Sequence, residues 1–455
     1  SAIEWIRVAA SPINDEWIIA TKDAADDIKV QVCTGADPGV SCGSVTTITT
    51  VGVADFRNYD VSYEKLSGDA LLVYSNTTAD MLRKIEWTGG SWTNDALITT
   101  SNTSGTVEWV ELTSRNNSNE IGIAYSDTND DVSAYRWGGT ALDGVSGLIT
   151  TDGGTGNMRK FDVSFEGTSG EMFVAAPLLS ATTVAYGQLA STTWTIGTGT
   201  TPDVLTVFTD LPEQPSSGDL LGISTHGTAA TTLSEGYYWT GSGITDTALG
   251  DDNLQTWASY YQLSAIAYLN ATYPAVAVIS NSTATDDIDW WTVTGTTLTD
   301  QTANARSRGA TRFVDLFDYP NITKVLLITS DTNSDLWADT WDGAAVAGTA
   351  WTDLTSGGTL EGSLAAVNTD VFDFDFRLKA VAVSDSCTCT DGASWTIING
   401  DQCTLSTTCN LGANKFRIWN GALRITSAGS LNANGCFVKD TESLFVINGG
   451  KLTCR

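Results

Sequence analysis

The chain repeats itself with a period of about 51 residues, and this repeat restricts its fold more than any other feature. The segment 59–76 reads YDVSYEKLSGDALLVYSN, and the segment 161–178 reads FDVSFEGTSGEMFVAAPL. The two segments begin 102 residues apart, which corresponds to two periods. Self-similarity at a fixed spacing indicates one supersecondary unit that is repeated along the chain.

Three landmarks recur in successive units: an aromatic residue that opens the unit, a residue that ends an apolar strand, and a large residue before a turn. The opening residues are Trp5, Tyr59, Trp109, Phe161, Phe208, Trp257, Phe313 and Phe372. The strand-ending residues are Thr21, Ser75, Ser126, Ala176, Ser224, Ser280, Ser330 and Ser384. The residues before the turn are Cys33, Trp87, Trp137, Leu189, Trp239, Trp291 and Trp341. The landmarks predict seven complete units and the beginning of an eighth.

Each unit is predicted to hold about four strands, because short β-branched and aromatic runs alternate with turn-forming residues and helical periodicity is almost absent. In the second unit we expect strands at 58–64, 69–75, 80–87 and 91–99. The strand 70–74 is apolar on both faces, which is typical of a sheet covered on both sides. The sequence therefore predicts an all-β fold with a seven-bladed β-propeller, closed with residues 3–8 at the seam; an eight-bladed ring is the alternative.

A second domain is expected after the repeats, with boundaries at 1–378 and 379–455. Short apolar strands between residues 416 and 452 are separated by Asn-Gly, Ala-Gly and Gly-Gly corners. Such corners resemble those between the rungs of a parallel β-helix, and a small β-sandwich is the alternative. A module of this size buries little core, so disulfides would have to stabilise it.

The cysteines favour disulfides over a zinc site, since CxxC pairs are absent and the chain has a single histidine, His226. The eight cysteines are Cys33, Cys42, Cys387, Cys389, Cys403, Cys409, Cys436 and Cys454. Cys33 and Cys42 flank a turn-rich loop and are expected to pair. The six C-terminal cysteines allow 15 pairings, among which the sequence does not choose. Disulfides indicate an oxidising, extracellular environment.

Six sequons support the same location. The triplet Asn-x-Ser/Thr begins at Asn76, Asn102, Asn116, Asn270, Asn281 and Asn321. We expect these asparagines to carry N-linked glycans on loops of the propeller. All six precede residue 330, so the C-terminal module would be bare and available as a contact surface. Ser1 begins directly with strand-like sequence, so we expect a mature chain whose signal segment was removed.

The net charge of −30 argues against nucleic acid or an anionic membrane as a partner, because both bind basic patches. No run of 18 apolar residues occurs, so no transmembrane segment is predicted. The remaining partners are small ligands, other proteins and copies of the chain itself.

Calcium is the one metal that the sequence suggests. The strings Asp127-x-Asn129-x-Asp131 and Asp331-x-Asn333-x-Asp335 occupy the same hairpin in units three and seven. Alternating Asp and Asn oxygens can converge on a hard cation. The alternative is a solvated turn, since Asp and Asn are also turn formers.

No catalytic residues are predicted. A sialidase-like enzyme would need Ser-x-Asp-x-Gly-x-Thr-Trp boxes, which the chain lacks. The many carboxylates make any glycosidase pair uninformative. Trp290 and Trp291 are adjacent and would face opposite sides of a strand, which favours core packing over a sugar platform. His226 is expected in a solvated turn.

The C-terminal residues Cys387-Thr388-Cys389, Trp395–Ile398, Cys403, Cys409 and Asn420–Leu423 resemble the cysteine-rich tails of archaeal surface proteins. The remainder resembles a repeat propeller. These resemblances imply a secreted structural or adhesive surface protein, which we expect to assemble into a homopolymeric filament or array through the C-terminal module or terminal strands. A monomeric carbohydrate-binding propeller is the alternative, and a glycoside hydrolase is a further one.

Overall fold

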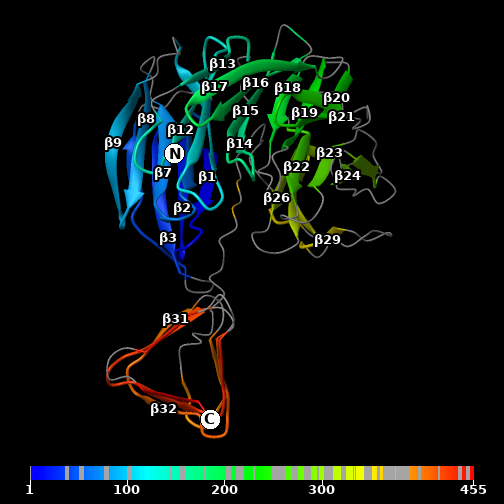
Figure 1. The fold of residues 1–455 in the computed structure, drawn as a ribbon. Helices are drawn as coiled ribbons and strands as arrows, with labels where there is room; N and C mark the ends of the chain where they lie inside the picture. The colour runs from blue at the N-terminus through cyan, green and yellow to red at the C-terminus, as the bar shows by residue number, and fades with distance from the viewer. Residues whose placement is uncertain are drawn as a thin grey trace. The chain divides into compact units, whose positions relative to one another are not determined.

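The structure, a computed structural model, describes residues 2–454 with gaps, of which the longest cover 212–219, 248–261, 302–310, 343–350, 362–372 and 376–388. The described residues form β-strands and turns and no helix. The chain divides into two compact units, Ser1–Leu378 and Lys379–Arg455 (Figure 1). The all-β prediction is confirmed.

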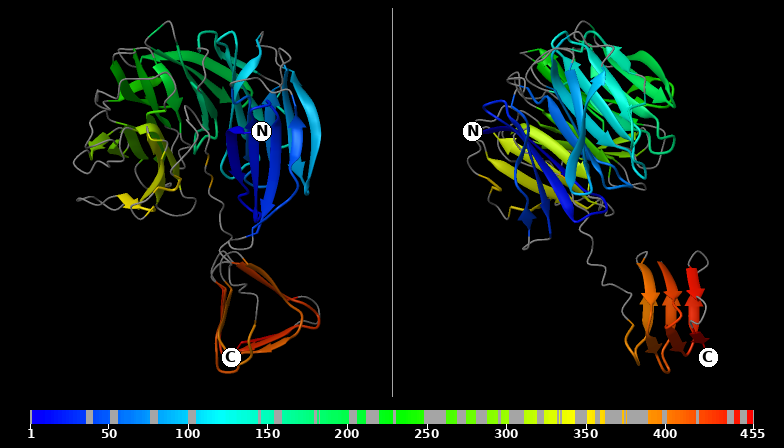
Figure 2. Two further views of the ribbon diagram at one scale, coloured as in Figure 1. Left: turned by 180° about the vertical axis from the view of Figure 1, so that it is seen from behind. Right: turned by 90° about the vertical axis from the view of Figure 1, so that its left-hand side faces the viewer.

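The described part of the first unit contains seven antiparallel sheets, in which consecutive strands are neighbours except that β5 of the first sheet pairs with β3 (Figure 2). The first three sheets consist of β1 (Ile3–Ala10), β2 (Glu16–Asp23), β3 (Ile28–Thr34), β4 (Ser41–Cys42) and β5 (Thr46–Thr49); β6 (Tyr59–Tyr63), β7 (Ala70–Ser75), β8 (Met81–Thr88) and β9 (Ser91–Thr99); and β10 (Val107–Ser114), β11 (Ile121–Asp127), β12 (Val132–Trp137) and β13 (Gly147–Thr150). Each sheet therefore corresponds to one sequence repeat.

The next four sheets continue this order. They consist of β14 (Asp162–Phe165), β15 (Met172–Pro177), β16 (Thr183–Ala190) and β17 (Thr193–Thr200); β18 (Thr206–Asp210), β19 (Leu220–Thr228), β20 (Thr231–Trp239) and β21 (Ile244–Thr247); β22 (Ser264–Tyr268), β23 (Ala275–Ser280), β24 (Ile288–Thr294) and β25 (Thr297–Asp300); and β26 (Thr311–Asp318), β27 (Val325–Asp331), β28 (Leu336–Trp341) and β29 (Trp351–Asp353). Four short strands per unit is the arrangement of a propeller blade.

The second sheet shows why the repeat folds this way. Its four strands agree with the expected ranges to within one residue. Every residue of β7 is buried, as expected for a strand covered on both faces. The turn between β8 and β9 places Gly89 at φ 58° and Gly90 at φ 89°, a backbone conformation that glycine adopts without steric cost.

Large side chains fill the space between successive sheets, as the third landmark predicts. Trp137 and Trp239 are each 1% exposed. Trp290 and Trp291 point to opposite faces of β24, because they belong to two separate core clusters. The prediction that these adjacent tryptophans are core residues is confirmed.

One expectation needs correction. His226 lies within β19, paired with Leu233 of β20, and not in a turn. Threonine, which is common in β-strands, occurs on both sides of His226, so this polar run extends the β19–β20 hairpin and does not end it. The landmark Trp257 lies outside the described residues.

The second unit contains three parallel sheets among its described residues, each with three strands. The sheets consist of β30 (Trp395–Ile397), β33 (Phe416–Ile418) and β36 (Cys436–Val438); β31 (Asp401–Leu405), β34 (Gly421–Ile425) and β37 (Ser443–Val446); and β32 (Thr408–Asn410), β35 (Ser430–Ala433) and β38 (Lys451–Cys454). Consecutive strands visit the three sheets in turn, and the three sheets form the sides of a triangle (Figure 1).

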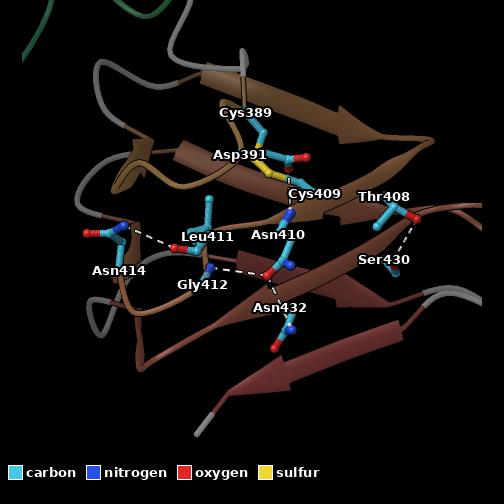
Figure 3. The surroundings of a disulfide bond; sticks show 10 residues. All are labelled: Cys389, Asp391, Thr408, Cys409, Asn410, Leu411, Gly412, Asn414, Ser430 and Asn432. Atoms are coloured by element: carbon cyan, nitrogen blue, oxygen red, sulfur yellow. Dashed lines mark hydrogen bonds between the residues drawn. A yellow bond between two sulfur atoms is a disulfide. The ribbon is translucent and has the colours of Figure 1, made fainter.

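The interior of this triangle is apolar, with Leu411, Phe416, Leu423 and Ile425 at most 1% exposed. Outward side chains align between neighbouring turns (Figure 3): Ser430 Oγ lies 3.0 Å from Thr408 Oγ1, and Asn432 Nδ2 donates to Asn410 Oδ1 at 3.3 Å. Each pair is 22 residues apart, because one full turn of the chain separates its members. A parallel register fixes this alignment.

Candidate functional site

An open groove of about 370 Å³ lies between the first and second sheets. Its walls come from β3, from the chain that joins β4 to β5, and from the β8–β9 hairpin. The lining residues are Val30, Val32, Gly43, Ser44, Thr46, Trp87, Gly90, Ser91 and Trp92. All nine residues are uncharged, although the chain carries a net charge of −30.

A break in the outer strand of the first sheet creates one wall of the groove. β3 pairs with β4 through Cys33 and Cys42, and again with β5 from Val30 to Ile28. Between the two pairings, Gly43 donates its N–H to the Val32 carbonyl at 2.8 Å. The disulfide Cys33–Cys42, with an S–S distance of 2.04 Å, joins β3 to β4 just before this break.

Trp87 and Trp92 form the opposite wall. They face each other across the β8–β9 hairpin, with ring centroids 5.4 Å apart and planes inclined at 53°. Trp87 Nε1 donates to Glu16 Oε1 at 2.9 Å, and the same oxygen accepts the Tyr63 hydroxyl at 2.8 Å. Both indoles are partly exposed. Among the described residues, Trp92 Nε1 has no hydrogen-bond partner, so one indole is fixed and the other presents a donor.

A second cluster consists of ion pairs on and beside the first strands of the sheets. Arg7 of β1 donates through Nε to Asp60 Oδ1 at 3.0 Å and through Nη2 to Glu111 Oε1 at 2.6 Å. Its Nη1 lies 3.3 Å from Asp373 Oδ1. The side chains of Asp60, Glu111 and Asp373 are each less than a tenth exposed. One guanidinium therefore joins carboxylates that come from three separate repeats.

Glu111 is the centre of this cluster. Its carboxylate also bonds Arg57, and its Oε1 lies 3.4 Å from Arg159 Nη1. Arg57 itself is fully buried, with its guanidinium carbon 5.5 Å from the Trp109 ring centroid. Burial by itself would raise the pKa of Glu111, but the guanidiniums of Arg159, Arg7 and Arg57 outweigh burial and lower it. Glu111 is thus held as an anion and cannot donate a proton near neutral pH. The arrangement suits cross-linking better than acid–base catalysis.

A carboxylate-to-backbone link connects neighbouring repeats. Asp60 Oδ2 accepts the N–H of Leu112 at 2.8 Å, and Asp162 Oδ2 accepts the N–H of Leu211 at 2.6 Å. In both cases the aspartate follows the opening aromatic by one residue and the leucine follows the next unit's aromatic by three. The Asp of the repeated motif therefore ties one innermost strand to the next.

The Glu of the same motif makes a second link between repeats. Trp137 Nε1 donates to Glu64 Oε1 at 2.7 Å, and Trp239 Nε1 donates to Glu166 Oε1 at 2.5 Å. Trp87 and Glu16 repeat this contact in the first two sheets. The tryptophan landmark thus serves as both a space-filling group and a donor to the preceding repeat.

The residues predicted to bind calcium lie in equivalent hairpins. Asp127 Oδ1 accepts the N–H groups of Asn129 and Asp131 at 2.9 and 3.2 Å, and Asp331 Oδ1 accepts those of Asn333 and Asp335 at 2.8 and 3.0 Å. Each leading aspartate thus stabilises its own turn. Within the described ranges, no three His, Cys, Asp or Glu side chains form a group that could hold a metal. Calcium binding stays a prediction.

Of the six sequon asparagines, the described ranges include Asn116, which is exposed in the turn between β10 and β11. Asn76, Asn102, Asn270, Asn281 and Asn321 lie outside them. Glycosylation stays a prediction.

Disulfides are present in both units. Besides Cys33–Cys42, Cys389 bonds Cys409 (Figure 3) and Cys436 bonds Cys454. Cys403 is also disulfide-bonded, and Cys387 lies outside the described residues. Cys389 and Cys409 are 20 residues apart, about one full turn of the chain, whereas Cys436 and Cys454 are 18 residues apart and lie on β36 and β38, which belong to different sheets. The spacing of the cysteines alone could not decide these partners.

Sequence reasoning missed the groove and the ion-pair cluster. The groove depends on a strand break and on packing between two repeats, for which the sequence carries no pattern. The Asp and Glu of the repeated motif were visible, but their partners lie in the next repeat, 52 and 73 residues away, and are a backbone N–H and a Trp indole.

No protein-family model matches the chain, and no curated protein matches it. Solved structures with a similar fold include the six-bladed fungal lectin of Aleuria aurantia, at 12% identity over 68% of this chain and 97% of that chain, with a TM-score of 0.37. AofleA from Arthrobotrys oligospora matches at 10% identity, over 77% and 85%, with a TM-score of 0.39.

The β-propeller domain of the trilobed protease from Pyrococcus furiosus matches at 7% identity over 78% of this chain and 98% of that chain, with a TM-score of 0.43. The chain is thus similar to β-propellers. At these identities and TM-scores, the likeness carries no argument about the ligands or the role of this chain. No helix long and apolar enough to cross a membrane occurs among the described residues.

Proposed function

We propose that the chain is a non-enzymatic, extracellular structural or adhesive protein that assembles with copies of itself through the second unit or terminal strands. The observation that supports this most is the attachment of residues 373–375 to β1. Asp373 Oδ2 accepts the N–H of Val8 at 2.7 Å, and Asp375 Oδ2 accepts the N–H of Ala10 at 2.7 Å. The end of the first unit is thereby fastened to its beginning.

This attachment lies at the end of the first unit that leads to the second unit, where force from an assembly contact would enter the first unit. The second unit begins at Lys379, so a pull that travels along the chain from that unit reaches residues 373–375 first. There it meets two backbone hydrogen bonds and the ion pair with Arg7. Charge-assisted bonds of this kind are stronger than neutral ones.

The same attachment supports a proposal for the ring itself. Asp373 follows Phe372 by one residue, and Val8 follows Trp5 by three, which is the register of the Asp60–Leu112 and Asp162–Leu211 links. Residues 373–375 would then occupy the innermost position beside β1, and the ring would consist of seven complete blades with this segment at the seam. The second unit would be a short β-helix.

The absence of an enzymatic role is supported by the ion-pair cluster. Asp60, Glu111 and Asp162, which lie on β6, β10 and β14, are paired with arginines or backbone N–H groups. Of these, Glu111 is held as an anion by three guanidiniums, which makes it a poor proton donor near neutral pH. The extracellular location and the archaeal resemblance rest on the cysteines and sequons and stay predictions.

Electron microscopy of the native, unreduced protein tests the assembly. Filaments or sheets that disappear when residues 379–455 are replaced by an unrelated folded domain would support it. Dispersed particles at all concentrations, together with a monomeric mass in sedimentation, would overturn it. A hydrolase role is tested separately by incubation with glycans, and release of sugar would contradict the non-enzymatic proposal.

A further inference from the structure

The groove between the first two sheets has the composition of a site for an uncharged, hydroxyl-rich ligand. Its floor is apolar, with Val30 and Val32, and its rim carries the hydroxyls of Ser44, Thr46 and Ser91. Small-molecule sites in proteins typically combine apolar and aromatic walls with a few polar groups. The volume of about 370 Å³ lies within the usual range for such sites.

Charge narrows the class of ligand. The lining is neutral on a chain with a net charge of −30, so an anion would be repelled by the surrounding field and would find no cation in the groove. A cation would find no carboxylate in the lining. The remaining candidates are neutral molecules.

The tryptophan pair selects among neutral molecules. Trp87 is held by its hydrogen bond to Glu16, so its ring plane is set before a ligand arrives. Trp92, inclined at 53° to it, keeps a free Nε1 donor within the described residues. Indoles pair an apolar face with a polar edge, and a pyranose ring likewise has C–H faces and a hydroxyl edge. We propose that this groove binds a neutral glycan through Trp87 and Trp92.

The fourth sheet contains a matched control. Trp194 pairs with Leu189 across the β16–β17 hairpin, just as Trp92 pairs with Trp87 across the β8–β9 hairpin. A Cβ on Gly147 would lie 2.6 Å from the Trp194 ring, so this indole packs against β13 of the preceding sheet. Trp194 therefore has the same position in its repeat but is not among the residues that line the groove.

The test uses the full chain on an array of neutral oligosaccharides, followed by titration calorimetry with the best binder. Trp92→Ala should weaken binding at least tenfold, while Trp194→Ala should leave the dissociation constant within about twofold. Trp92→Phe, which keeps an aromatic face but loses Nε1, should fall between the wild type and Trp92→Ala. Unchanged thermal unfolding of both Trp92 variants separates loss of a contact from loss of the fold.

Three outcomes would overturn the proposal: no neutral glycan bound by the wild type, binding unaffected by Trp92→Ala, or binding confined to apolar peptides. The proposal goes beyond the assembly role and can be separated from it. A protein that binds glycans but stays monomeric would refute assembly alone, and one that forms filaments but binds no glycan would refute the groove alone.

Discussion

Asp373 and Val8 are 365 residues apart in the sequence, yet the Asp373 carboxylate accepts the Val8 N–H at 2.7 Å. Arg7, the neighbour of Val8, contributes an ion pair to the same carboxylate. The bond has the register of the links between neighbouring repeats. This bond therefore places Asp373, near the end of the first unit, next to β1, the first strand of the same unit.

Removing this carboxylate should destabilise the first unit. Asp373→Ala leaves the partly buried Val8 N–H without its acceptor, and we expect a loss of about 1–3 kcal/mol in the free energy of unfolding. Urea unfolding measures it. Asp95→Ala is the control, because Asp95 pairs with Arg83 at 3.0 Å but is 46% exposed, and an exposed pair contributes under about 1 kcal/mol. Equal losses in the two variants would contradict the special role of Asp373.

Asp373 should also make stability depend on pH. Burial raises its pKa from 3.8 to about 7, against the opposing effects of Arg7 and the Val8 N–H. The fold thus favours the protonated form, so this contribution to stability is complete below the ordinary value and is lost as the pH rises through about 7. Between about pH 4 and about pH 7 the wild type should lose stability relative to Asp373→Asn, and above about pH 7 the difference should stay constant. Parallel curves for the two proteins would refute this assignment.

The hydrogen bond from Trp137 to Glu64 should contribute to the free energy of unfolding beyond the apolar contacts of the Trp137 ring. Trp137→Phe keeps most of the buried ring but removes the Nε1 donor from Glu64, whose carboxyl is buried. We expect a loss of about 1–3 kcal/mol in urea unfolding. Trp92→Phe is the control, since its Nε1 has no partner among the described residues and the change should cost less than about 1 kcal/mol. An equal loss of unfolding free energy for Trp92→Phe and Trp137→Phe would show that the smaller ring, and not the lost hydrogen bond, causes the destabilisation.

The hairpin of Asp127 separates turn formation from calcium binding. Asp127→Ala removes the acceptor of three backbone N–H groups, those of Gly105, Asn129 and Asp131, and should cost about 1–3 kcal/mol with or without calcium. Thermal unfolding of the wild type in calcium and in chelator is the second measurement. A higher unfolding temperature in calcium that is absent from Asp127→Ala would establish the predicted site. No effect of the chelator would leave Asp127 as a turn former only.

Local features of the fold could be predicted because they depend on neighbouring residues. The four strands of the second repeat follow from alternation and turn residues, and the β8–β9 hairpin follows from Gly89 and Gly90. The burial of Trp290 and Trp291 follows from their adjacency on one strand. His226 was misplaced because a polar run of β-branched residues can extend a hairpin as well as end it.

The repeat period, the all-β character and the residues that recur in each unit were determined by the sequence alone, since each strand and turn is encoded within a few residues. Only the tertiary structure decided which groups meet: Asp60 with Leu112, Glu64 with Trp137, and Asp373 with Val8. It also decided that a break in one outer strand opens a groove beside Trp87 and Trp92. These contacts depend on how separate repeats pack, and the packing of side chains far apart in the chain leaves no local pattern in the residues that make it.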